Sequence, residues 1–254
     1  MNVRKAVVER TDKPLAERYV SMSNALARSA QGLTLSEKRV VALALAKSDS
    51  KSAADKTRAA FSGGWTVHLT AEEYSSEFGL SAVVAYEQLK SAADNLLKRQ
   101  VRTMTQTIKG IREVKTNWCG QCTYHHGEGW VEIAFTSQIS PHLLDLKSKF
   151  TSYKLQQVSA LRSVYAWRLF ECLKSWGDKG RWSPDMDAFL HAMDVPMSYR
   201  SNFKDVRVRV IEPALKELRK KDNQEIELEL KKSGRKITGL VFTFRPNPQG
   251  QLEL

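Results

Sequence analysis

The order of its predicted elements, which repeats in the two halves, constrains the fold of this chain more than any other feature. Each half is predicted to hold a helix, a short second helix, a longer third helix and a two-stranded hairpin. The helical stretches carry apolar residues at intervals of three and four, and the hairpin strands carry them at every second position. With 254 residues, the chain is long enough for two such units.

The first half begins with two stretches of helical periodicity and continues through several short elements. The predicted elements are, in order, helices over 17–30 and 34–47, a loop over 48–64, a strand over 65–69, and helices over 71–78 and 82–98. Gly79 is expected to end the helix over 71–78, and Ser81 is expected to cap the helix over 82–98. A hairpin is then predicted to pair one arm, 100–114, with a returning strand over 130–135.

The second half repeats this order with a more strongly amphipathic first helix. The predicted elements are a strand over 150–155, helices over 162–176, 186–193 and 202–221, and hairpin strands over 226–230 and 237–244. Pro213 lies inside the third helix and is expected either to kink it or to mark the first turn of a helix that begins later.

Three helices followed by a hairpin are the pattern of a helix-turn-helix with a β-wing. We therefore predict an α+β protein of two tandem winged-helix domains, over 1–137 and 138–254. The third helix of such a unit fits the major groove of DNA, which is wide enough for one α-helix.

The charge balance points to a polyanionic partner. The chain has 40 Lys plus Arg against 28 Asp plus Glu, a formal net charge of +12. Each phosphate that a basic residue neutralises releases a condensed counterion and strengthens binding. A solvated basic surface is the alternative explanation. There is no apolar run long enough to span a membrane and no secretory signal, and three cysteines make no disulfide framework, so a reducing bacterial cytoplasm is expected.

The strongest candidate for base reading is the third helix of the second half. Between Tyr199 and Lys221 there are eight basic and three acidic residues. On a helix, one side is apolar and is expected to pack inward, namely Val206, Val210, Ile211, Ala214 and Leu218. The residues expected to reach base edges are Arg200, Ser201, Asn202, Lys204, Arg207 and Val208.

A second set of basic residues is expected to contact phosphates, which positions a protein on DNA without reading sequence. Arg209 lies further round the recognition helix. The others flank the predicted hairpin turns: Lys231, Lys232, Arg235 and Lys236 in the second half, and Lys109, Arg112 and Lys115 in the first.

Two motifs suggest chemistry that we do not expect. Cys119 and Cys122, followed by His125 and His126, have a spacing that could hold zinc, but a turn with free thiols is favoured because no second ligand pair lies at a distance. Adjacent histidines on a strand point to opposite faces, so they do not form the metal site of a nicking enzyme. There is no Gly-rich phosphate loop of the ATPase type. No catalytic residue, metal or cofactor is expected.

The chain resembles the Rep initiators of theta-replicating, iteron-containing plasmids. The segments that carry the resemblance lie at 33–39, 85–90, 150–155, 161–174 and 203–218, together with the closing hairpin, and the likeness extends from Met22 to Arg245. It implies two winged-helix domains related by pseudo-twofold symmetry, with the C-terminal recognition helix reading the iteron and Arg207 at a base-reading position. The family often has a second basic residue where this chain has Val208.

The resemblance also implies how such a protein acts in replication and in the control of its own gene. Monomers would bind iterons and open the origin, while dimers joined through the first domain would bind an inverted repeat and repress their own gene. Host initiator protein, helicase and chaperones are the implied partners. Two alternatives stay open: a rolling-circle nicking endonuclease, and a purely transcriptional repressor with tandem winged helices.

Overall fold

The computed structural model describes residues 13–125, 127–144, 149–221 and 224–246. The chain divides into two compact units that are interleaved in sequence. The first lies within 1–23, 36–99 and 116–159, and the second within 24–35, 100–115 and 160–254. This grouping differs from the expected division at 137, because 138–159 belongs with the first unit and two segments of the N-terminal half belong with the second.

The first unit contains a winged helix around the helix α2, Leu35–Ser48. The elements that follow are β2 (Gly64–Thr70), α4 (Ala71–Phe78), α5 (Ala82–Leu96), β5 (Cys119–His125) and β6 (Trp130–Thr136). The sheet has the order β2-β6-β5. Trp65 on β2 stacks on Phe135 of β6 with ring centroids 5.0 Å apart, and both side chains are buried.

Local signals set the helix boundaries of this unit, and those of Gly79 and Ser81 were expected. Thr70 and Glu73 form a capping box at the start of α4, and Gly79 ends the helix in the left-handed region with φ 61°. The hydroxyl of Ser81 accepts from the Val84 amide at the start of α5.

The second unit repeats the same order of elements. They are α8 (Val164–Lys174), β8 (Arg181–Trp182), α9 (Met186–Ala192), α10 (Met197–Arg200), α11 (Phe203–Val206), α12 (Glu212–Lys221), β9 (Gln224–Ser233) and β10 (Lys236–Pro246). The sheet order β8-β10-β9 again places the last strand in the centre. Trp182, Phe189 and Phe242 stack in its core with centroids 5.4–5.9 Å apart.

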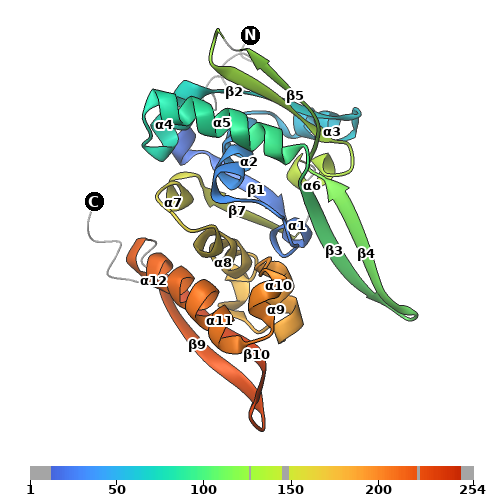
Figure 1. The fold of residues 1–254 in the computed structure, drawn as a ribbon. Coiled ribbons are helices and arrows are strands. Elements are labelled where there is room, and N and C mark those ends of the chain that lie inside the picture. Colours follow the sequence, from blue (N-terminus) through green and yellow to red (C-terminus); the bar gives the residue numbers. More distant parts are fainter. Residues whose placement is uncertain (1–12, 126, 145–148, 222–223, 247–254) are drawn as a thin grey trace, which may run out of the picture. The chain divides into compact units, whose positions relative to one another are not determined.

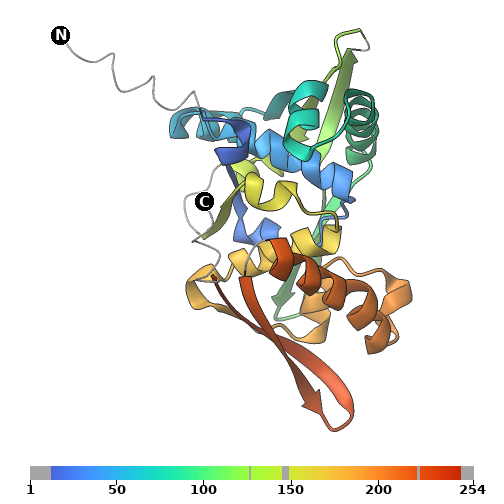
Figure 2. The same ribbon diagram turned by 90° about the vertical axis from the view of Figure 1, so that its left-hand side faces the viewer.

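The prediction of two winged-helix units is therefore confirmed. In Figure 2 the ribbon of β9 and β10 extends well beyond the helices of its own unit, as a wing does. The implied pseudo-twofold relation concerns the mutual placement of the units and stays a prediction.

One predicted helix, over 17–30, is wrong. A 3₁₀ turn, Leu15–Glu17, leads instead to the strand β1 (Tyr19–Ser23) and the short helix α1 (Asn24–Ala27). Strand β1 pairs antiparallel with β7 (Phe150–Lys154), and the hydroxyls of Ser21 and Ser152 lie 2.8 Å apart at the centre of the pair. The partner strand is 131 residues away, so periodicity within one window could not reveal it.

The predicted loop over 48–64 is wrong as well. It contains α3 (Ala53–Phe61), whose first turn is capped by Ser52 through a hydrogen bond from the Asp55 amide. A serine three residues ahead of an aspartate was the available signal. Directly after the predicted domain boundary at 137, the chain likewise forms helix α6 (Ser140–Leu144), and α7 (Gln156–Ser159) follows β7.

The predicted pairing of 100–114 with 130–135 is also wrong. Strand β3 (Gln100–Thr107) pairs with β4 (Gly110–Asn117), which begins at a glycine with φ 127° directly after the turn residues 108 and 109, while β6 pairs with β2 and β5. Glycine permits this positive φ without the steric cost that a side chain would bring. A continuous β-branched stretch was thus two strands rather than one.

Candidate nucleic-acid interface

The helix-turn-helix of the second unit is held from beneath by a buried ion pair on α8. Arg168, 2% exposed, donates from Nη1 to Glu171 Oε2 at 3.0 Å, and Glu171 is fully buried. The same guanidinium donates from Nε and Nη2 to the carbonyl oxygen of Ala192 at 3.1 and 2.5 Å. Ala192 is the last residue of α9, so a buried cation satisfies a free carbonyl at that helix end.

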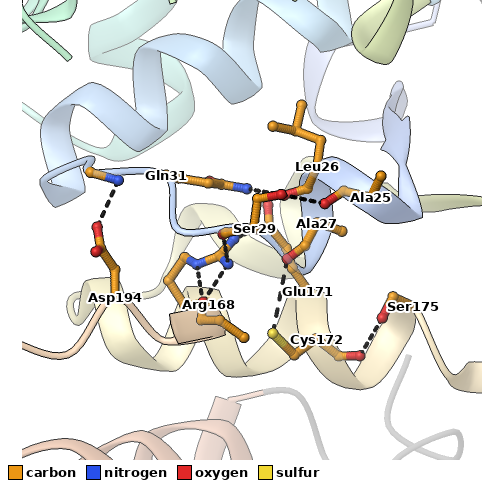
Figure 3. Close-up of polar contacts among 12 residues, drawn as sticks. Ala25, Leu26, Ala27, Ser29, Gln31, Arg168, Glu171, Cys172, Ser175 and Asp194 are labelled. Atoms are coloured by element: carbon orange, nitrogen blue, oxygen red, sulfur yellow. Dashed lines mark hydrogen bonds and ion pairs between the residues drawn. The ribbon is translucent and has the colours of Figure 1, made fainter. Parts of the chain in front are cut away.

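The turn after α9 is held by two further contacts. Asp194 has a left-handed backbone, φ 51°, which aspartate tolerates better than most residues. Its carboxylate, labelled Asp194 in Figure 3, accepts from the Gly32 amide at 2.7 Å and from Arg102 Nη2 at 2.5 Å. These contacts explain why 24–35 and 100–115 belong to the second unit rather than to the first.

The recognition helix is continuous from 203 to 221 but changes its winding at the centre. Between α11 and α12, the residues Arg207–Ile211 form a π-helical turn, closed by the Glu212 amide donating to the Arg207 carbonyl. Pro213 follows immediately. Proline has no N–H to donate, and its ring crowds the carbonyl four residues earlier, so the wider turn accommodates it without breaking the helix.

The two faces of this helix follow the sequence prediction. The residues expected to pack inward, Val206, Val210, Ile211, Ala214 and Leu218, are all buried. Lys204, Arg207 and Val208 are exposed on the outer side, and Val208 leaves 51% of its surface open to solvent. An exposed valine between two cations gives this face an apolar contact as well as charge.

Two of the three remaining residues of the expected base-reading set have structural partners. Arg200 donates from Nε to the carbonyl oxygen of Val195 at 2.8 Å, which folds α10 back on the turn. Asn202 caps α11 by accepting from the Lys204 amide at 2.9 Å, so its oxygen is occupied. Ser201 is exposed in the turn between them.

Two partners of the helix arginines had no sequence signal. Arg207 Nε lies 2.7 Å from Glu212 Oε1, and Arg209 lies over the ring of Tyr199 with its guanidinium carbon 5.1 Å from the centroid. Arg209 also approaches Asp205 at 3.4 Å. The sequence did not indicate Glu212 as the partner of Arg207, because ion pairs on a regular α-helix join residues three or four positions apart and these two are five apart.

The wing carries the basic residues at its tip. Lys231, Lys232, Arg235 and Lys236 are all exposed, and Gly234, φ 59°, is the first of the two turn residues, which fits a type II′ turn. At the wing's root, β10 passes so close to Pro184 that a Cβ added to Gly239 would lie 2.7 Å from the Pro184 carbonyl oxygen. The close approach, together with the Leu240 amide bond to that carbonyl at 3.0 Å, fixes where the wing emerges.

Family models match nearly the whole of this architecture. "Initiator Replication protein, WH1" covers residues 19–174, and "Initiator Rep protein, WH2" covers 185–244. The chain belongs to the initiator replication protein family. It is a DNA-binding replication initiator, as the resemblance implied.

Three known proteins are similar to this initiator in fold or in sequence. The crystal structure of the Pi initiator protein in complex with iteron DNA shares its fold, with a TM-score of 0.71 at 22% identity, over 90% of this chain and 97% of that one. An uncharacterized 27.6 kDa protein of Escherichia coli is 24% identical over 89% of the chain and 95% of its own length. A probable replication protein rep of Bifidobacterium longum is 27% identical over 45% of the chain, a match that spans 38% of that relative.

The basic residues of the first half lie on the β3–β4 hairpin, which projects from its surroundings in Figure 1. Lys109, Arg112 and Lys115 are exposed, and Lys115 approaches Glu113 at 3.6 Å. By its contacts this hairpin belongs to the second unit, so the structure brings these residues into the unit that holds the recognition helix.

The cysteine and histidine motif lies on a strand rather than in a turn. Cys119 and Cys122 are both on β5, and His125 at its end stacks on Trp130 with centroids 5.4 Å apart. His126 lies outside the described residues. Across the part of the chain that the structure describes, no three His, Cys, Asp or Glu side chains gather as a metal site would require. No helix there has the length and apolar character needed to cross a bilayer.

Proposed function

We propose that this initiator starts the replication of a plasmid by binding repeated sequences, the iterons, at its origin. The observation that carries the proposal is the exposed face of the recognition helix, where Lys204, Arg207 and Val208 project from a helix whose other side is buried. The Pi initiator, which shares the fold, was solved in complex with iteron DNA.

Each residue of that face suits a feature of a base edge. Arg207 can donate two hydrogen bonds to O6 and N7 of guanine, and Val208 can contact the methyl group of thymine. Lys204 adds a third contact one turn earlier. Arg200, Ser201 and Asn202 would approach bases at the N-terminal end of the helix, with Asn202 donating from its amide nitrogen because its oxygen caps α11.

Phosphate contacts would hold the recognition helix in register. The exposed wing residues Lys231, Lys232, Arg235 and Lys236 would contact the backbone of one DNA strand, and Arg209 would contact another part of the site. The hairpin residues Lys109, Arg112 and Lys115 would extend this basic surface. Such contacts supply affinity and salt dependence but no sequence information.

The proposal includes the separate roles of monomers and dimers that the family resemblance implies. Monomers would bind iterons, open the origin and recruit host initiator protein, helicase and chaperones. Dimers joined through the first domain would bind an inverted repeat and repress the protein's own gene. The protein would work without catalysing a reaction, in the cytoplasm of a bacterium, where the origin DNA lies.

Electrophoretic mobility shift with the repeats that flank the gene on its native replicon tests iteron recognition. Random DNA of equal length serves as the competitor. We expect a ladder of complexes whose number equals the number of repeats and which the competitor does not remove. Removal by random DNA at the same concentration as by repeat DNA would contradict the proposal.

A nicking assay tests the absence of catalysis. Supercoiled origin plasmid is incubated with the protein and Mg²⁺ or Mn²⁺, and the expected product is unrelaxed plasmid. Relaxed circles with protein attached to a 5′ end would show a rolling-circle enzyme instead.

A further inference from the structure

The thiols of Cys119 and Cys122 lie in contact on one face of the first unit's sheet. Both are free, and their Sγ atoms are 3.8 Å apart. The strand that carries them, β5, is the edge strand of the sheet β2-β6-β5. Neither residue belongs to the set proposed above to contact DNA.

A β-bulge brings the two side chains together. In a regular strand, residues three apart point to opposite faces, because side chains alternate. Here Cys119 pairs with Phe135, Gln121 with Ala134 and Cys122 with Ile133, so Gly120 is an extra residue that the partner strand does not match. Phe135 and Ile133 are two apart and share a face, and their partners Cys119 and Cys122 therefore share a face too.

The two thiols differ in environment. Cys119 is 2% exposed, whereas Cys122 is partly open to solvent and approaches the carbonyl oxygen of Ala93 on α5 at 3.3 Å. A hydrogen bond from the Cys119 thiol lowers the pKa of Cys122, and the same contact, with burial, raises the pKa of Cys119. Cys122, whose sulfur is accessible, is thus the better nucleophile, and the buried Cys119 is the resolving thiol.

We propose that Cys119 and Cys122 form an oxidation site that takes oxidants of the hydroperoxide class and closes a reversible intrachain disulfide. The Cys122 thiolate attacks the peroxide oxygen, the O–O bond breaks, and Cys122 becomes a sulfenic acid while the hydroxide leaves as water with a solvent proton. The Cys119 sulfur then attacks the Cys122 sulfur and loses its proton. The sulfenic oxygen leaves as a second water, so two thiols are oxidised and one peroxide is reduced.

The reaction requires a small movement with a local consequence. The sulfurs must close from 3.8 Å to about 2.05 Å, the length of a disulfide bond. Cys122 then has no proton to donate to Ala93, so a contact between β5 and α5 is lost. Disulfides in reducing compartments of this kind are usually transient and redox-sensing.

Thiol counting and mass spectrometry of the purified full chain test the site. Hydrogen peroxide is the probe, and Cys172, fully buried on α8, is the internal control. We expect the thiol count to fall from three to one, the peptide that carries both cysteines to lose the mass of two hydrogen atoms, and dithiothreitol to restore both values.

Two variants assign the roles. Cys119→Ser leaves Cys122 without its resolving thiol, so a sulfenic acid should accumulate at Cys122, where a dimedone reagent traps it. The matched control Cys172→Ser should still form the disulfide. Circular dichroism checks that both fold, and if Cys119→Ser does not, the wild-type measurement decides alone. Equal oxidation of Cys172, over-oxidation without an intrachain bond, or one tightly bound zinc shielding both thiols would each overturn the proposal. None of these outcomes depends on iteron binding.

Discussion

Arg207 and Glu212 form an ion pair across five positions of one helix, with Nε 2.7 Å from Oε1. On a regular α-helix, side chains five positions apart point about 140° away from each other, because each residue advances about 100°. The π-helical turn over Arg207–Ile211 inserts one residue, so Glu212 stands where the fourth residue would otherwise stand. Pro213 thus has a consequence for the exposed face of the recognition helix, because the turn that accommodates this proline also places a carboxylate beside Arg207 and restricts its orientation.

Replacing Arg207 with alanine should weaken binding to the specific repeat by about 1–3 kcal/mol and relax one base position, because a bidentate guanine contact is lost. Competition of wild-type and variant protein for single-base variants of the repeat measures this. Lys220→Ala, which removes an exposed cation further along the helix, is the matched control. Equal losses on specific and random DNA would show that Arg207 contacts only phosphate.

Pro213→Ala should separate specificity from stability. An alanine permits a regular helix, which would turn Arg207 away from Glu212 and from its present direction. The free energy of unfolding should change by less than about 1 kcal/mol, because the regained backbone hydrogen bond and the greater entropy of the unfolded chain oppose each other. Urea unfolding and competition binding together check this, and unchanged base preference would contradict it.

Lys232→Ala should weaken binding to all DNA about equally. A wing lysine that neutralises one phosphate contributes to affinity but reads no base. The slope of log K against log salt should decrease in magnitude by about 0.9. Titrations of specific and random duplexes over a series of salt concentrations measure both quantities, and Ser233→Ala at the same turn is the control. A loss confined to the specific duplex would assign Lys232 a base contact.

Removing one partner of the buried ion pair should unfold the second unit more easily. Glu171→Ala leaves the Arg168 charge buried without its carboxylate, at a cost of about 3–5 kcal/mol in the free energy of unfolding. Arg58→Ala, which breaks an exposed pair with Asp55, should cost less than about 1 kcal/mol. Urea unfolding compares the two, and similar midpoints would contradict the structural role of the buried pair.

Acid should destabilise the second unit through His191. Burial, aided by the charge of Arg102, lowers the pKa of His191, whose Nε2 lies 3.4 Å from the Ala30 amide as an acceptor. The unfolded state, with a pKa of about 6.5, therefore binds a proton before the folded state does. Stability is complete above that pH and falls as the pH drops toward the folded value, by at most about 1.4 kcal/mol per pH unit.

His191→Gln should remove this part of the acid sensitivity. Unfolding midpoints in urea at about pH 7.5 and about pH 5.5 measure it. Burial also lowers the pKa of His142 in the first unit, which leaves a residual dependence of the same sign. If the variant loses as much stability as the wild type, His191 does not carry the effect.

Local patterns in the sequence predicted much of this protein. The capping residue Ser81, the glycine after α4 and the inward residues of the recognition helix act within a few positions of themselves, and each is found in its predicted role. The repeated order of elements was enough to predict two winged helices. The helical periodicity also predicted which cations of the recognition helix are exposed, and the predicted hairpin turn did so for the cations of the wing.

Contacts between residues far apart in the sequence determined the remaining features of the fold. Strand β1 exists because β7 offers it hydrogen bonds from 131 residues away, and β3 pairs with β4 because the chain reverses between Thr107 and Gly110. The units interleave in sequence because Asp194 binds Gly32 and Arg102, contacts that no window of neighbouring residues contains. The orientation of Arg207 depends on a π-helical turn, and the contact of Cys119 with Cys122 depends on a bulge. In both cases one extra residue changes which side chains share a face, and only the surrounding hydrogen bonds determine where that residue is accommodated.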